Sequence, residues 1–77
     1  MEKIFNKIED YPEDGALVLI YEQDFMPDLF FATFYEQDKS YRYFVGDELC
    51  DLVPRRGVNY YYAYPIDLIN YIQDNLI

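Results

Sequence analysis

The sequence predicts an α+β domain: a small antiparallel sheet of about four strands, with a short N-terminal helix and a C-terminal helix packed on the sheet. Strand-like segments follow one another along the chain before the last helical segment, an order typical of antiparallel α+β domains. The 77 residues suffice for one domain, residues 1–77. Its 10 Tyr and 6 Phe residues bury large areas per residue, so a short chain can assemble a core.

Four segments have the apolar, β-branched and aromatic composition of strands. They are residues 16–21, 29–35, 41–45 and 58–64. The first is an unbroken apolar run, which favours a central strand covered on both faces. Turn sequences rich in Pro, Gly and Asp precede and separate these segments, as at Pro12 to Gly15 and Pro54 to Gly57.

Helical spacing of apolar residues occurs at both ends of the chain. Residues 1–9 place Ile4, Phe5 and Ile8 at such a spacing, which predicts a short helix. Near the C-terminus, Pro65 suits a first helical position, where its missing N–H costs nothing. A helix over residues 65–75 would then gather Ile66, Ile69, Ile72 and Leu76 on a broad apolar face, which we expect to cover the sheet.

The segment 11–21 reads Y-P-E-D-G-A-L-V-L-I-Y, and the segment 58–65 reads V-N-Y-Y-Y-A-Y-P. Together they resemble a small domain family of phages and prophages whose function is unknown. Members of that family carry a P-x-D-G-x-x-V-L-V opening and a V-T-H-W-M-P-L-P ending. Here Tyr60 stands in place of the family's His, Tyr61 in place of its Trp and Ala63 in place of its first Pro. The resemblance implies a mobile-element setting and no particular activity.

Composition restricts the classes of partner. Fifteen acidic residues against six basic ones give a net charge of −9, which disfavours nucleic acid and anionic lipid as direct partners and favours a basic protein surface. The chain has no His, which excludes His-based catalysis and Cys–His zinc sites. The single Cys50 fits a reducing, cytoplasmic compartment. We see no signal peptide, and the longest apolar run is too short to span a membrane.

Acidic residues gather in two loops that a meander would bring to one end of the sheet. The six side chains are Glu22, Asp24, Asp28, Asp47, Glu48 and Asp51. One interpretation is a set of solvated turns, since Asp and Glu are common there. A Ca²⁺ or Mg²⁺ site is another, although the chain lacks a D-x-D-x-D-G loop. A third is a phosphate-like array that imitates a nucleic acid and occupies a basic groove.

Tyrosines alternate along the last strand-like segment. Tyr60, Tyr62 and Tyr64 would share one face of a strand, with Tyr61 and Ala63 on the other. At least one face should be core. We expect one of the three alternating tyrosines to be exposed in contact with a partner or a second copy, which leaves a homodimer open. The alternative is that both faces of this strand are covered.

These patterns favour a non-catalytic binding protein without cofactor or metal. We expect a cytoplasmic inhibitor from a phage or mobile element that blocks a basic surface of a nucleic-acid-handling host protein. A CRISPR effector or a restriction enzyme is the natural class of target, and DNA mimicry a natural means. The alternative is a cytosolic protein-interaction module that uses an exposed Tyr-rich face.

Overall fold

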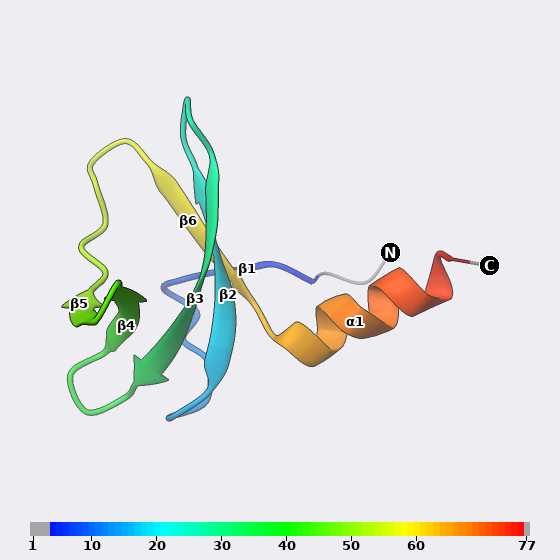
Figure 1. Cartoon of the computed structure of the whole chain (residues 1–77), viewed down its shortest axis with the longest axis horizontal. Coiled ribbons are helices and arrows are strands. Elements are labelled where there is room, and N and C mark those ends of the chain that lie inside the picture. The colour runs from blue at the N-terminus through cyan, green and yellow to red at the C-terminus, as the bar shows by residue number, and fades with distance from the viewer. Residues whose placement is uncertain (1–3, 77) are drawn as a thin grey trace.

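A computed structural model describes residues 4–76 of the chain, which form one six-stranded antiparallel sheet and one C-terminal helix (Figure 1). The strands are β1 (Asn6–Lys7), β2 (Leu17–Gln23), β3 (Asp28–Tyr35), β4 (Ser40–Val45), β5 (Glu48–Asp51) and β6 (Asn59–Ala63), and the helix is α1 (Pro65–Asp74). The predicted α+β class is confirmed, but the prediction of about four strands is wrong, because the sheet has six. The four predicted segments correspond to β2, β3, β4 and β6, and the sequence analysis did not predict β1 or β5.

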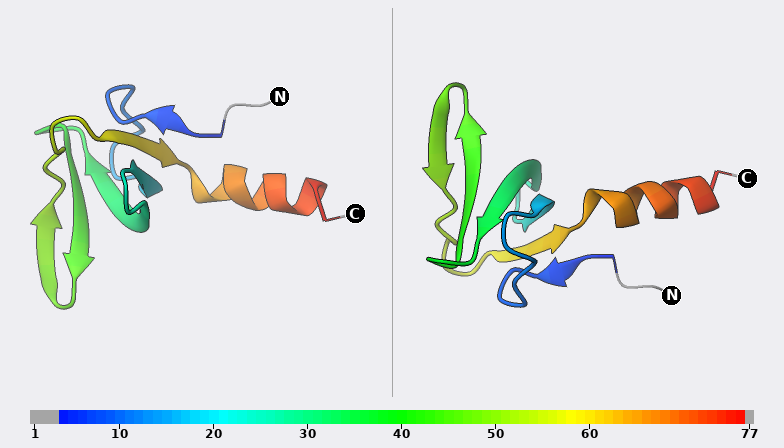
Figure 2. Two further views of the ribbon diagram at one scale, coloured as in Figure 1. Left: turned by 90° about the horizontal axis from the view of Figure 1, so that it is seen from above. Right: turned by 90° about the horizontal axis from the view of Figure 1, so that it is seen from below.

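The sheet has the order β1-β6-β2-β3-β4-β5. Strands β2 to β5 form a meander, and β6 returns to pair with the free edge of β2. The run 16–21 is therefore central, as its apolar composition predicts, but it is not covered on both faces, because Leu17 is 54% exposed. The sheet bends strongly, so that the β4–β5 hairpin crosses at a large angle to β2 and β3 and lies on the opposite side from α1 (Figures 1 and 2).

The core lies on the concave face of this bent sheet. Alternate residues of the central strands point into it, and Val18, Ile20 and Phe34 are fully buried. Aromatic rings fill the remaining space. Phe34 lies 5.0 Å from Tyr41 and 5.4 Å from Tyr11, measured between ring centroids. The other buried apolar residues are Ile8, Ala32, Tyr60, Tyr62 and Ala63.

The predicted N-terminal helix is wrong over the described part of residues 1–9, and residues 1–3 lie outside the described part. Asn6 and Lys7 pair with Tyr62 and Tyr61 of β6, and the Ile8 amide donates to the Tyr60 carbonyl. Ile8 itself is buried in the core. A helix this short is expensive to nucleate, whereas the edge of β6 offers the segment backbone partners directly.

The predicted C-terminal helix is present, but it does not pack on the sheet as expected. None of the ten residues of α1, all of them described, is buried, and α1 projects away from the sheet (Figure 1). Pro65 occupies its first turn, as predicted. Only Tyr64 separates β6 from α1, so the chain has no loop with which to turn the helix back over the strands.

Buried Tyr41 should make the fold sensitive to alkali. Its hydroxyl donates to the Ile8 carbonyl at 2.8 Å, and burial raises the pKa of this phenol above its ordinary value. The unfolded chain then loses this proton at lower pH than the folded chain does. The stability that the neutral phenol contributes is therefore complete below pH ~10 and is lost as the pH rises above it.

We expect the free energy of unfolding, measured by urea denaturation between pH 8 and 12, to fall more steeply for the wild type than for Tyr41→Phe. The difference in slope should approach ~1.4 kcal/mol per pH unit above pH ~10, the limit for one proton. Parallel curves for the two proteins would mean that Tyr41 ionises as readily in the folded chain as in the unfolded one.

Candidate protein-binding cleft

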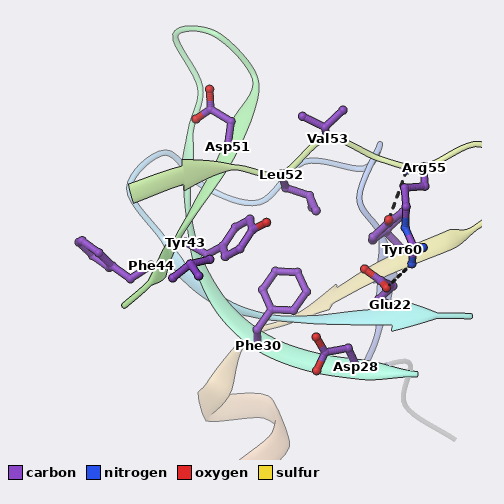
Figure 3. A pocket seen from close by; sticks show the side chains of 11 residues that line it. Glu22, Asp28, Phe30, Tyr43, Phe44, Asp51, Leu52, Val53, Arg55 and Tyr60 are labelled. Atoms are coloured by element: carbon purple, nitrogen blue, oxygen red, sulfur yellow. Dashed lines mark hydrogen bonds and ion pairs between the residues drawn. The ribbon is translucent and has the colours of Figure 1, made fainter. Parts of the chain in front are cut away.

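A cleft of about 480 Å³ opens between the end of β2, the start of β3 and the β4–β5 hairpin (Figure 3). Its floor is apolar and includes Phe30, Tyr43 and Leu52, and the rings of Phe30 and Tyr43 lie 4.9 Å apart. Three carboxylates, those of Glu22, Asp28 and Asp51, line it as well. We call this site the acidic cleft. The other lining residues are Phe44, Val45, Val53, Arg55 and Tyr60.

The bend of the sheet creates the acidic cleft. Phe30 and Tyr43 point to the same face as the core residues of their strands, but they lie toward the end where the β4–β5 hairpin has turned away from β2 and β3. Both rings pack against the core and remain half-buried. Their outer surfaces are therefore available to a ligand, next to carboxylates on the rim.

Arg55 ties the segment after β5 to the end of β2. Its guanidinium donates to Glu22 and, at 2.7 Å, to Asp24, and its backbone N–H donates to the Tyr60 hydroxyl. The Phe25 amide donates to the Asp24 carboxylate, and this bond together with Arg55 lowers the pKa of Asp24. The charges of Glu22 and Asp24 are thus partly neutralised by Arg55.

The six predicted acidic residues do not form one continuous face. Asp51 pairs with Arg42, which also binds Asp38. Asp28, Asp47 and Glu48 form no ion pair with any base in residues 4–76. Asp28 lines the acidic cleft. Asp47 and Glu48 lie at the tip of the β4–β5 hairpin, outside the cleft, because the bend points that tip away (Figure 2).

The three predicted Tyr residues belong mainly to the core. Tyr60 and Tyr62 are 6% and 4% exposed, and the Tyr62 hydroxyl donates to the Asp10 carbonyl. Tyr64 is half-buried, and its hydroxyl accepts the Glu13 amide. Tyr60 and Tyr62 therefore do not supply the exposed tyrosine that the sequence analysis expects, and Tyr64 is only partly exposed. Tyr60 nevertheless lines the acidic cleft.

The sequence analysis did not single out Phe30, Tyr43 and Leu52 as site residues. Aromatic residues in strand segments are typical core residues, and no local pattern distinguishes the ones left at the mouth of a cleft. Within residues 4–76, no group of three or more Cys, Asp and Glu side chains is arranged to hold a metal ion. Cys50 has a free, half-buried thiol.

No helix among the described residues is long and apolar enough to cross a membrane. No protein-family model, curated protein or solved structure matches the chain.

Proposed function

We propose that this protein is a non-catalytic binding protein whose acidic cleft receives a basic segment of another protein. The main supporting observation is that the Phe30 and Tyr43 rings line the same cleft as Asp28, which forms no ion pair within residues 4–76. Asp51 also lines the cleft, but its carboxylate pairs with Arg42. A Lys or Arg side chain is attracted both to the face of an aromatic ring and to a carboxylate, and its aliphatic stem suits the apolar floor. The cleft supplies all three within one site.

Charge supports the same class of partner. With a net charge of −9, the chain repels anionic ligands and attracts basic surfaces from a distance. Asp28 has no ion-pair partner among residues 4–76, so its whole charge is available to an incoming cation. Basic segments are characteristic of proteins that bind nucleic acids, and these form our proposed class of target.

We further propose that the protein acts in the cytoplasm of a host cell as an inhibitor from a phage or mobile element, against a CRISPR effector or restriction enzyme. The support is the resemblance of residues 11–21 and 58–65 to the phage-borne family, the acidic charge and the single thiol. Insertion of individual basic side chains is favoured over a phosphate-like array, because Arg55 neutralises two of the six carboxylates that such an array would use.

A titration followed by ¹⁵N NMR tests the acidic cleft with a defined probe, a short soluble peptide that alternates Arg with Gly. We expect chemical-shift changes to concentrate on Phe30, Tyr43 and Leu52, and the affinity to fall as salt rises. A peptide with Glu in place of Arg is the control and should cause no changes. Shifts distributed equally over Glu9, Glu13 and Asp38 would indicate general attraction to an acidic protein and contradict a specific cleft.

A further inference from the structure

One side of α1 is apolar and uncharged. Ile69 and Ile72 lie three residues apart on one side of the helix, and Leu76, two residues beyond its end, follows Ile72 by four and extends this stripe; Leu76 is 77% exposed. The charged residues Asp67 and Asp74 lie on the opposite side, by the same periodicity. A projecting helix with such a stripe exposes to water the surface that a helix normally buries.

A second unpartnered apolar surface lies on the convex face of the sheet. Phe5, Tyr21, Leu29 and Tyr61 line a hollow of about 450 Å³, which we call the convex hollow. Tyr21 stands between Leu29 and Tyr61 in the strand register, and its ring lies 6.0 Å from that of Phe5. Leu29 is 57% exposed. Like the stripe of α1, the convex hollow carries no charged side chain.

We propose that a second copy of this chain covers both surfaces, with the end of α1 of each protomer inserted in the convex hollow of the other. The apolar stripe projects and the apolar hollow receives, so the two surfaces can contact each other. In a dimer with a two-fold axis, the stripe of each chain contacts the hollow of the other, and both contacts belong to one interface. Because neither surface is charged, two chains of net charge −9 can meet there without burying a carboxylate.

The available area suits a weak, reversible dimer. Four large apolar residues of the stripe and the convex hollow are about half exposed or more: Leu29, Ile69, Ile72 and Leu76. At roughly 200 Å² for each side chain, their exposed surface is on the order of 500 Å² on each protomer, at the low end of the areas that protein interfaces bury.

The geometry favours a partner's helix over the chain's own. Tyr61 precedes Pro65 by four residues, so the convex hollow lies near the base of α1, while Ile72 lies near its far end and Leu76 just beyond it. A helix of ten residues is ~15 Å long. Two such helices side by side and antiparallel bring the far end of each to the base of the other, next to that chain's convex hollow.

Sedimentation equilibrium of the full chain from ~1 to ~500 µM tests the proposal, since this range covers weak and moderate interfaces. We expect a reversible dimer for the wild type. Ile72→Asp in the helix and Leu29→Asp in the hollow should each weaken it by at least ~30-fold, the loss typical of a central interface residue. Asn70→Asp, which adds the same charge to the opposite side of α1, should leave the dimer intact.

Mixing the Ile72→Asp and Leu29→Asp variants tests whether the helix of one chain occupies the convex hollow of the other. A mixed dimer retains one intact contact, between the unaltered helix of the Leu29→Asp chain and the unaltered hollow of the Ile72→Asp chain. It should therefore form more tightly than either variant alone. A wild type that stays monomeric would overturn the proposal. So would a Leu29→Asp protein that dimerises like the wild type, because the helices would then pair without the hollow.

Both substituted side chains are exposed, so the circular dichroism spectra of the variants should match the wild type. Ile72→Ser and Leu29→Ser, which add no charge, replace the Asp variants if a spectrum shows loss of the sheet. Each Ser variant should then dimerise more weakly than the wild type, and mixing the two should restore part of the dimer. The absence of either result would contradict the proposal.

Discussion

Phe34→Ala is expected to lower the free energy of unfolding by about 3–5 kcal/mol, the usual cost of removing a buried Phe side chain. Phe34 is 0% exposed, and its ring lies between Tyr11 and Tyr41 at centroid distances of 5.4 and 5.0 Å. Its removal would leave a cavity at the centre of the concave face. A domain of 77 residues has a total stability of only ~4–12 kcal/mol, so much of the variant should be unfolded at 25 °C.

Urea denaturation followed by circular dichroism measures this loss, and Phe31→Ala is the matched control. Phe31 lies three residues earlier on β3, but on the convex face, with 57% of its surface exposed. We expect it to cost less than ~1 kcal/mol, because no cavity forms. Equal losses for the two variants would contradict the assignment of the core to one face of β3.

The main elements were predictable because each is defined by a local pattern. The apolar run at β2 and the Pro65 start of α1 are visible in a few consecutive residues. The short strands β1 and β5 are not, because their strand character comes from the strands with which they pair and not from their own sequence. Leu49 and Cys50 pair with Phe44 and Tyr43 across a tight turn, and Asn6 pairs with Tyr62.

The candidate site was only partly predictable for a related reason. Alternation along β6 correctly places Tyr60 and Tyr62 on one face, but it does not say which face is core. The meander correctly suggests that the two acidic loops share one end, but the bend of the sheet separates Asp47 and Glu48 from the cleft. The contacts of Arg55 with Glu22 and Asp24 join residues 33 and 31 positions apart, and no local pattern indicates them.

Reversal of the two acidic-cleft charges, by Asp28→Lys with Asp51→Lys, is expected to weaken binding of the Arg–Gly peptide by about 30-fold at low salt. Asp28→Lys replaces an attraction with a repulsion at the rim, and Asp51→Lys adds a positive charge to the lining of the cleft, each worth ~1 kcal/mol for exposed charges. The effect should shrink as salt rises, because exposed charges are screened. The fold should persist, since both side chains are exposed and Arg42 keeps its contact with Asp38.

Glu9→Lys with Glu13→Lys is the control for net charge. Each reversal adds two positive charges, so either pair changes the net charge from −9 to −5. Glu9 and Glu13 are exposed and lie outside the acidic cleft. This pair of substitutions should therefore weaken peptide binding by less than ~3-fold, through the long-range electrostatic field of the protein alone. Isothermal titration calorimetry at two salt concentrations measures the peptide affinity of both double variants and of the wild type. If both pairs weaken binding equally, the peptide senses only the total charge, and the acidic cleft is not the binding site.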